Sequence, residues 1–518
     1  MGPLLLLLFF QAGAHQAAMQ AFNEHRYADA APQFIAALKT EAEGSAEYQE
    51  SVLSLGESLY FQKRFAEAIP WFEKAAGGSR GSHSLVAAFM LGNACMQGRA
   101  DEKALAAFAS VFQVKPESAA AHLLLADMML RAQMELGAER EARRALEIDP
   151  RLPQAHFVLG EAALARGDAG QAIGEFRKEL EINPNFAMAY YRLGDALCKQ
   201  GAWEDAISQL ERAIWLNPNR SGPYVLLGKA YLSRQDPENA QAALRHAVQM
   251  DPRDPTARSL LEQTLQHAGK KEEAPPGDIT YLRGRNEYLA GHIAAAIPVL
   301  EKARLAGSPH IELLYMLGNS YLQTRDIPKG RIAFADLFGV PPDSGAAHLF
   351  TAQMLIRQEF EDDAQSELQE ALTREPKLPE ANFILGEIAI YRAQIDTAIE
   401  KLTREISLDP DFAMAYYRLG DAYTRRGEWE HCIPPLQKAV WLNPTYSGPY
   451  ILLGKAYFQT ADLADAERML RRALQMDPQN SSAHYFLGRT LIQSGRAEEG
   501  KKLLQRSVEL KRESGQFP

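Results

Sequence analysis

The sequence predicts an all-α fold in which pairs of antiparallel helices repeat along nearly the whole chain. Two observations carry this prediction. A Leu-Gly pair, or a close variant of it, recurs every 34 residues, and several segments return almost unchanged 226 residues later. Periodic self-similarity of this kind is the signature of a repeat architecture. The first spacing predicts the helix pair as the building unit, and the second predicts that a whole array of such pairs was duplicated.

The 34-residue spacing is marked by one small residue in each unit. Twelve residues after most of these markers comes a second small residue, and four further on comes a large apolar residue, as in Gly160, Ala172 and Phe176. A proline closes many units, for example Pro150 and Pro184. The markers are Gly92, Ala126, Gly160, Gly194 and Gly228, then Gly284, Gly318, Ala352, Gly386, Gly420, Gly454 and Gly488.

Each part of this pattern has a physical reason in a helix pair. Small residues let two helices, A and B, approach closely, while large apolar residues at i, i+3, i+4 and i+7 fill the seam between neighbours. Proline cannot continue a helix, so it ends helix B and starts the turn to the next unit. One unit alone cannot bury its apolar face, so we expect the units to be stable only when stacked.

The duplication is visible in three pairs of segments with one common offset. FAMAYYRLGDA occurs at 186–196 and again at 412–422. LPQAHFVLGE at 152–161 returns as LPEANFILGE at 378–387, and SGPYVLLGKAY at 221–231 returns as SGPYILLGKAY at 447–457.

Together these residues resemble the tetratricopeptide repeat (TPR) family, over nearly the whole chain. The resemblance implies a right-handed superhelical α-solenoid of about fourteen to fifteen antiparallel helix pairs. It also implies a non-catalytic protein whose A helices line an inner, concave face where protein or peptide partners lie.

The repeats predict the domain organisation. We expect a first array at 15–267, a break at 268–278 where Pro275, Pro276 and Gly277 end helical structure, and a second array at 279–513. The second array should end in a capping helix with a polar outer face, followed by a tail at 514–518. We expect the first array to be shortened, because the break replaces helix B of its last unit.

The first fourteen residues are similar to a secretory signal. Leu4 to Phe10 is an apolar run, and Ala12-Gly13-Ala14 offers a small-x-small cleavage site before His15, although no Lys or Arg precedes the run. The run is too short to span a bilayer, which takes about 20 residues. We therefore expect an exported protein, periplasmic or extracellular, with a cytoplasmic location as the alternative.

Composition narrows the functional classes. With 56 Lys and Arg against 66 Asp and Glu, the net charge is −10, and no basic cluster is present. Nucleic-acid binding needs such clusters, so it is not expected. The three cysteines form no disulfide framework and no CxxC pair, and the twelve histidines show no metal spacing. We expect no catalytic residues, no cofactor, no metal and no integral membrane span.

The candidate binding residues lie on the A helices. With the marker as position eight of each unit, positions five and nine should face inward. The resulting surface has aromatic residues, an acidic middle and a lysine at its far end, which suits a peptide with basic segments. The alternative is that these are solvated helix faces copied by duplication. The candidates are Asn93, Asp127, Phe157, Glu161, Tyr191, Arg192, Asp195, Lys229, Asn319, Phe383, Glu387, Tyr417, Arg418, Asp421, Lys455 and Arg489.

Arg192 and Arg418 each stand three residues before an acid, Asp195 and Asp421. We expect an ion pair within the helix, worth a few tenths of a kcal/mol, with a ligand-facing arginine as the alternative. Other family sites are absent. The second asparagine of a carboxylate clamp is replaced by Asp127 or Gln353, and no asparagine ladder precedes the Leu-Gly pairs.

The P-loop-like segment ending at Lys229 fails because five residues separate its glycines and Ala230 replaces the required Ser or Thr. The leading hypothesis is therefore a non-catalytic scaffold or adaptor, bacterial and exported, that binds partner polypeptides. The alternative is a regulatory or substrate-delivery subunit of a separate envelope or polysaccharide-assembly enzyme.

Overall fold

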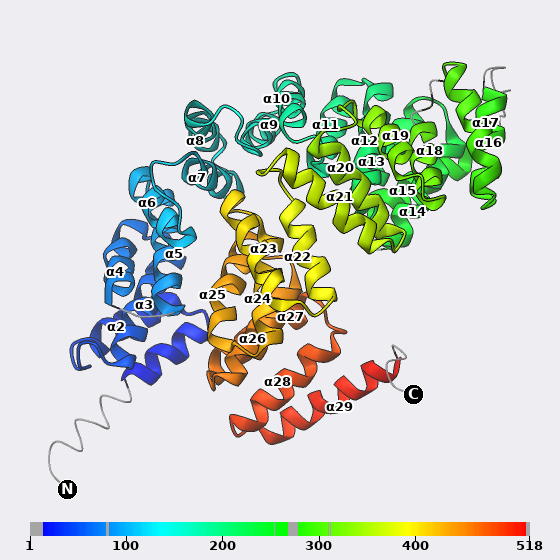
Figure 1. The fold of residues 1–518 in the computed structure, drawn as a ribbon. Helices are drawn as coiled ribbons and strands as arrows, with labels where there is room; N and C mark the ends of the chain where they lie inside the picture. Colours follow the sequence, from blue (N-terminus) through cyan, green and yellow to red (C-terminus); the bar gives the residue numbers. More distant parts are fainter. Residues whose placement is uncertain are drawn as a thin grey trace, which may run out of the picture. The chain divides into compact units, whose positions relative to one another are not determined.

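The computed structural model describes residues 14–78, 82–252, 254–267, 278–308, 310 and 312–513. All regular secondary structure in these ranges is α-helix (Figure 1). Three predicted segments lie outside the described residues. They are the signal segment apart from residue 14, the break apart from residue 278, and the tail at 514–518.

The first array opens with a helix at residues 14–23. The helices that follow it are α2 (Tyr27–Ala37), α3 (Ala46–Phe61), α4 (Phe65–Gly78), α5 (Ser82–Gln97), α6 (Asp101–Phe112), α7 (Ala119–Arg131), α8 (Glu135–Ile148), α9 (Ala155–Ala165), α10 (Ala169–Ile182), α11 (Ala187–Gln200), α12 (Trp203–Leu216), α13 (Ser221–Ser233), α14 (Pro237–Met250) and α15 (Pro255–His267).

The second array repeats this order of short helices. They are α16 (Asp278–Leu289), α17 (Ile293–Leu305), α18 (Glu312–Gln323), α19 (Ile327–Phe338), α20 (Gly345–Arg357), α21 (Glu361–Arg374), α22 (Ala381–Tyr391), α23 (Ile395–Leu408), α24 (Ala413–Arg426), α25 (Trp429–Leu442), α26 (Ser447–Gln459), α27 (Leu463–Met476), α28 (Ser481–Gln493) and α29 (Ala497–Glu513).

The helices form pairs, as the 34-residue spacing predicts. An A helix packs on its own B helix, as α9 does on α10, and the B helix packs on the next A helix, as α10 does on α11. Within the described ranges there are fourteen such pairs and the single helix α15, which packs on α13 and α14. The prediction of an all-α array of about fourteen to fifteen helix pairs is confirmed.

The marker glycine lets helix A touch the large apolar residue of helix B. A Cβ atom added at Gly318 would lie 2.5 Å from Cε1 of Phe334, a distance at which one of the two groups must move. Phe334 is completely buried. The marker and the apolar residue sixteen positions later are therefore two sides of one close contact between α18 and α19.

Some of the helices begin with a side-chain cap. Asp168 accepts a hydrogen bond from the backbone nitrogen of Gln171 at the start of α10, at 2.9 Å, and Asp462 accepts one from the nitrogen of Asp465 at the start of α27, at 3.2 Å. Such a cap satisfies one of the unpaired donors at a helix N-terminus and contributes about 1 kcal/mol.

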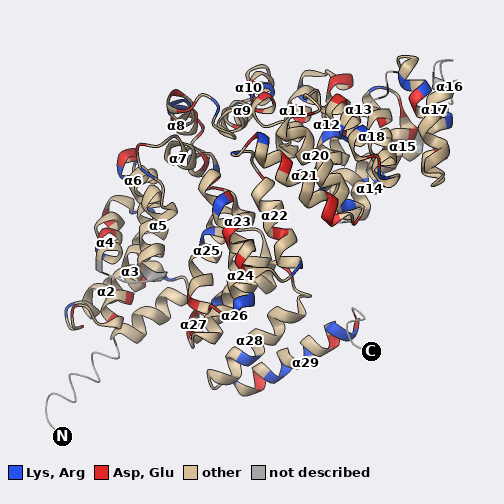
Figure 2. Ribbon diagram, in the orientation of Figure 1, with Lys and Arg blue, Asp and Glu red and all other residues tan. Residues whose placement is uncertain are grey.

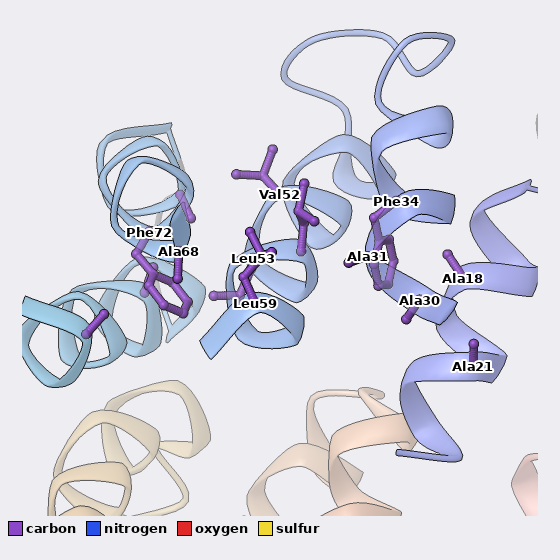
Figure 3. Packing of buried hydrophobic residues seen from close by; sticks show 14 residues of the cluster. Ala18, Ala21, Ala30, Ala31, Phe34, Val52, Leu53, Leu59, Ala68 and Phe72 are labelled. Atoms are coloured by element: carbon purple, nitrogen blue, oxygen red, sulfur yellow. The ribbon is translucent and has the colours of Figure 1, made fainter. Parts of the chain in front are cut away.

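The hydrophobic core runs between neighbouring helices. Figure 3 shows its N-terminal part, where Phe34 and Phe72 lie among alanines of adjacent helices. Both rings are completely buried, as are Ala30 and Ala68. Small residues facing large ones give dense packing along the seam, which is how stacked repeats stabilise one another.

The chain divides into two compact units that do not coincide with the two arrays. Unit 1 comprises residues 1–129 together with 389–518, and unit 2 comprises residues 130–388. Each unit therefore combines a part of the first array with a part of the second.

Candidate partner-binding face

The best-defined cluster of candidate residues lies on α9 and α11 in unit 2. Nη2 of Arg192 lies 2.9 Å from Oε2 of Glu161, so the arginine joins the A helices of two consecutive repeats. Oε1 of Glu161 and Nε of Arg192 are buried, and neither has a hydrogen-bond partner among the described atoms. Each therefore has hydrogen-bonding capacity that this arrangement leaves unused.

The expected ion pair between Arg192 and Asp195 is wrong. Asp195 instead pairs with Lys199, one turn further along α11, with Oδ2 and Nζ 2.9 Å apart. Arg192 reaches the neighbouring A helix because Glu161, at position nine of the preceding repeat, lies within range of its guanidinium. Sequence spacing within one helix could not show this, since the partner belongs to another helix.

Burial sets the electrostatics of this cluster. Loss of hydration raises the pKa of the Glu161 carboxyl, while the charge of Arg192 and its hydrogen bond act in the opposite direction. The arginine therefore holds a half-buried carboxylate on the helix-A face.

Aromatic side chains flank the pair. The Phe157 ring packs between those of Phe186 and Phe176, with centroids 4.9 Å and 5.7 Å away. The guanidinium of Arg192 lies 5.5 Å from the centroid of the Tyr191 ring, and that of Arg220 lies 5.9 Å away. Sequence analysis did not select Phe186 or Arg220, because both lie in the turns before the A helices.

The second array places the equivalent residues of α24 in unit 1 in a similar way. The Arg418 guanidinium lies 5.3 Å from the centroid of the Tyr417 ring, which packs edge-on against Tyr446 at 5.3 Å. Asp421 pairs with Arg425, with Oδ2 and Nε 3.1 Å apart. In both arrays, the aspartate three residues after the arginine therefore pairs with a basic side chain one helical turn further along.

The cationic end of the surface differs between the arrays. Lys229 is exposed, and no carboxylate in the described part of the chain forms an ion pair with it. Lys455 places its ammonium 5.2 Å from the Trp429 ring, and the Arg489 guanidinium lies 4.9 Å from that of Phe458.

Other candidates turn toward their own helices or are half-buried. Nδ2 of Asn93 donates to the carbonyl oxygen of Phe89, and Nδ2 of Asn319 donates to that of Tyr315, both at 3.0 Å. Asp127 in unit 1 and Glu387 in unit 2 are half-buried, and the Phe383 side chain is buried.

Two aromatic residues on A helices, Phe89 on α5 and Tyr315 on α18, are covered by the other array. Phe89 stacks on Trp441 with centroids 4.4 Å apart, and Tyr315 stacks on Trp215 with centroids 5.1 Å apart. The expected aromatic surface is therefore interrupted at these two positions. The signal in the sequence is the presence of Trp215 and Trp441 at equivalent positions of the two arrays.

Charge and metal-ligating groups are dispersed. Figure 2 shows Lys and Arg interspersed with Asp and Glu along the helices. In the part of the chain that the structure describes, no group of three His, Cys, Asp or Glu side chains is placed to hold a metal ion. His156 and His348 each lie 2.7 Å from a glutamate of their own repeat, Glu175 and Glu367. A search of the described helices finds none that combines the length and apolarity needed to cross a bilayer.

Comparison with known protein families gives one consistent result. Three family models, each for the tetratricopeptide repeat, match the chain, and together they cover more than half of it. The matched residues are 24–83, 136–185, 157–223, 222–254, 385–431 and 457–516. No curated protein matches the chain.

Solved structures of helical repeat proteins are also similar. MamA (residue 41 to the end) from Desulfovibrio magneticus RS-1 is 22% identical, with 33% of this chain and 96% of that one covered and a TM-score of 0.31. YrrB, a TPR protein with an unusual peptide-binding site, is 16% identical, with 36% of this chain and 94% of that one covered and a TM-score of 0.32. A chain in the structure of Naa15/Naa10 bound to HypK-THB is 13% identical, with 97% of this chain and 94% of that one covered and a TM-score of 0.32. Because the sequence identities and TM-scores of these structures are low, the assignment of a family depends on the family models.

Proposed function

The chain belongs to the tetratricopeptide repeat family, and from that premise we propose that it is a non-catalytic scaffold whose A-helix faces bind partner polypeptides. TPR repeats in general support protein interaction. A fold alone does not define a function, so the proposal depends on the cluster around Glu161 and Arg192.

The single observation that carries the proposal is the unused hydrogen-bonding capacity of this pair. Glu161 Oε1 is an acceptor and Arg192 Nε is a donor, and both are buried without a partner among the described atoms. A peptide group offers one donor and one acceptor. An extended segment laid along α9 and α11 would satisfy both atoms once the side chains that cover them move aside, and this would remove a cost of about 1–3 kcal/mol each.

The aromatic residues beside the pair would supply apolar contact. Tyr191 and Phe157 are both half-buried, so each retains exposed ring surface. Aromatic side chains bury a large area with few rotatable bonds, which is why they are enriched where proteins bind one another. In the second array the guanidinium of Arg418 lies against the Tyr417 ring in the same way, so the proposal includes this aromatic contact as a second site.

The charges of the cluster shape the expected partner. Basic segments of a partner would compete with Arg192 and Lys199 for Glu161 and Asp195. We therefore propose that hydrogen bonds and aromatic contacts contribute more to binding than net charge does, even for a basic peptide. Binding should then fall only a few-fold between low and physiological salt, because screening weakens exposed charge pairs most.

The test is recovery of partners from the native cell by the tagged full-length chain, with identification by mass spectrometry. Arg192→Ala combined with Arg418→Ala should lose polypeptides that the unmodified chain recovers. The matched control is Arg177→Ala with Arg404→Ala, which changes two exposed arginines on B helices and should recover the same set. Helical circular dichroism checks that each variant is folded.

Equal recovery by both double variants would reject the helix-A face as the binding site. A recovered enzyme that depends on Arg192 and Arg418 would instead favour the regulatory or delivery role.

We further propose that the protein is exported after cleavage between Ala14 and His15. Cleavage there would remove residues 1–14 and keep every described residue from His15 onward. Intact-mass analysis of the protein from its native cell tests this: a chain that starts at His15 supports export, and one that retains Met1 contradicts it.

A further inference from the structure

Contacts between the two arrays occur in reciprocal pairs. In unit 2, Trp215 of the first array stacks on Tyr315 of the second, with centroids 5.1 Å apart and ring planes 11° apart. In unit 1, Phe89 of the first array stacks on Trp441 of the second at 4.4 Å and 6°. Trp441 follows Trp215 by 226 residues, and Tyr315 follows Phe89 by the same number. The two stacks are thus one contact with the arrays exchanged.

A second aromatic pair obeys the same rule. Tyr190 lies 6.2 Å from Phe338 in unit 2, and Phe112 lies 6.2 Å from Tyr416 in unit 1. Again each residue has its counterpart 226 positions away in the other pair. All four side chains are buried, with exposed fractions between 2% and 8%. These are therefore interior contacts.

Basic side chains accompany the aromatic pairs. Arg212 donates from Nε and Nη2 to the carbonyl oxygen of Leu337, at 3.3 Å and 3.2 Å. Its counterpart Lys438 lies 5.8 Å from the centroid of the Phe112 ring and 5.4 Å from that of Tyr416. Arg357 adds hydrogen bonds to the carbonyl oxygens of Trp215 and Leu216. Donors thus meet carbonyl groups or ring faces of the other array.

Stacking of successive repeats cannot produce this pattern. In a linear array each repeat contacts its neighbours, whereas these pairs join residues separated by at least 100 positions in sequence. A contact between i and j that recurs with the copies exchanged is what two copies make when each presents the same surface to the other.

We propose that the two arrays recognise each other through one interface made twice. In each unit, the A-helix face at Phe89 or Tyr315 is a docking site for the C-terminal end of a B helix, which carries Trp441 in α25 or Trp215 in α12. Its occupant is the other array of the same chain, and external partners bind elsewhere on the A helices. The arrays therefore hold together without the covalent junction between them.

A nicked form of the full-length chain tests this. A protease recognition sequence inserted after Pro276 allows the folded protein to be cut between the arrays, with both fragments present. The nicked protein should elute in size-exclusion chromatography as one species, at the position of the uncut chain. Trp215→Ala with Trp441→Ala should weaken the association of the fragments at least ~100-fold, because buried aromatic residues carry most of the binding energy of an interface.

The matched control is Trp203→Ala with Trp429→Ala, the other duplicated tryptophans, which pack within single arrays. This variant should stay associated after nicking. Phe89→Ala with Tyr315→Ala removes the opposite side of each stack and provides a second route if the first variant folds poorly. When both sides are truncated together, the loss should be no greater than for one side, since the same contact is removed.

Two results would overturn the proposal. One is separation of the nicked unmodified chain into two fragments. The other is a Trp215 and Trp441 variant whose fragments bind as tightly as those of the unmodified chain.

Discussion

At the scale of single residues, the duplication supplies its own comparison of a charged and a neutral side chain. Tyr231 donates a hydrogen bond to Glu211 at 2.8 Å, whereas at the equivalent place in the second array Gln437 donates to Tyr457 at 2.9 Å. Burial raises the pKa of Glu211 to about 7, the charge of Glu312 adds to the rise, and the Tyr231 hydrogen bond opposes it. Burial of the carboxylate is therefore costly at neutral pH. The amide of Gln437 carries no charge, and its cost is one buried oxygen, Oε1, without a partner among the described atoms.

We expect Glu211→Gln to stabilise the protein in a pH-dependent way. Because the folded pKa lies above the unfolded value, the carboxyl contributes stability below about pH 4.5 and loses it as the pH rises through 7. The gain from the substitution should be near zero at pH 4.5 and reach about 3 kcal/mol above pH 8. Denaturant unfolding at several pH values measures it.

Gln437→Glu is the matched control, since it places the buried carboxyl at the second site. It should introduce a loss of stability over the same pH range. A constant difference between Glu211→Gln and the unmodified chain at every pH would contradict the assigned cause.

At the scale of helix pairs, the contact between Gly318 and Phe334 explains why the marker residue is small. Gly318→Ala adds a Cβ atom 2.5 Å from the ring. Overpacking costs about 1–3 kcal/mol, and the higher helix propensity of alanine returns up to about 1 kcal/mol. We expect a net loss of about 1–2 kcal/mol in the free energy of unfolding, measured by denaturant titration.

The next repeat shows how such a loss can be relieved. Its marker is Ala352, and Leu368 stands sixteen positions later, both completely buried. Phe334→Leu should therefore recover part of the loss in the Gly318→Ala background, although alone it removes buried contact. Purely additive effects of the two substitutions would show that the side chains do not meet.

Local periodicity explains how much of the fold could be predicted from the sequence. The marker spacing, the small and large residues and the closing prolines act within one helix pair or between neighbours, so a pattern of adjacent positions records them. The partner of Arg192 was mispredicted because Glu161 lies on another helix. The stacks of Trp215 and Trp441 were missed because they join residues that no local period relates.

At the scale of the whole molecule, the compact units cross the boundary between the arrays. Sequence duplication predicts two similar arrays, whereas unit 1 and unit 2 each combine residues of both of them. Destabilising one helix should therefore also destabilise helices that contact it but are distant in sequence. In a simple solenoid, by contrast, each repeat depends only on its neighbours.

A substitution at Phe108 can measure this coupling between helices that are distant in sequence. It is completely buried in α6, and its ring packs edge-on against Phe89, 5.7 Å away, which in turn stacks on Trp441 of α25. Phe108→Leu removes part of the support for Phe89 and should cost about 1–2 kcal/mol. We expect faster amide hydrogen exchange in α5 and α6 and also in α25, more than 300 positions further along the chain.

The duplication again supplies the reciprocal variant. Phe334 supports Tyr315 at 6.5 Å, and Tyr315 stacks on Trp215, so Phe334→Leu should increase exchange in α12. Leu244→Ala in α14, which packs on α13 and α15, should affect only nearby helices. If exchange after Phe108→Leu increases next to α6 but stays unchanged in α25, the stacks do not couple the arrays, and each array responds as an independent solenoid. If α25 and α12 respond each to its own variant, the chain behaves as two units that each need both arrays, which is the property that the reciprocal contacts predict.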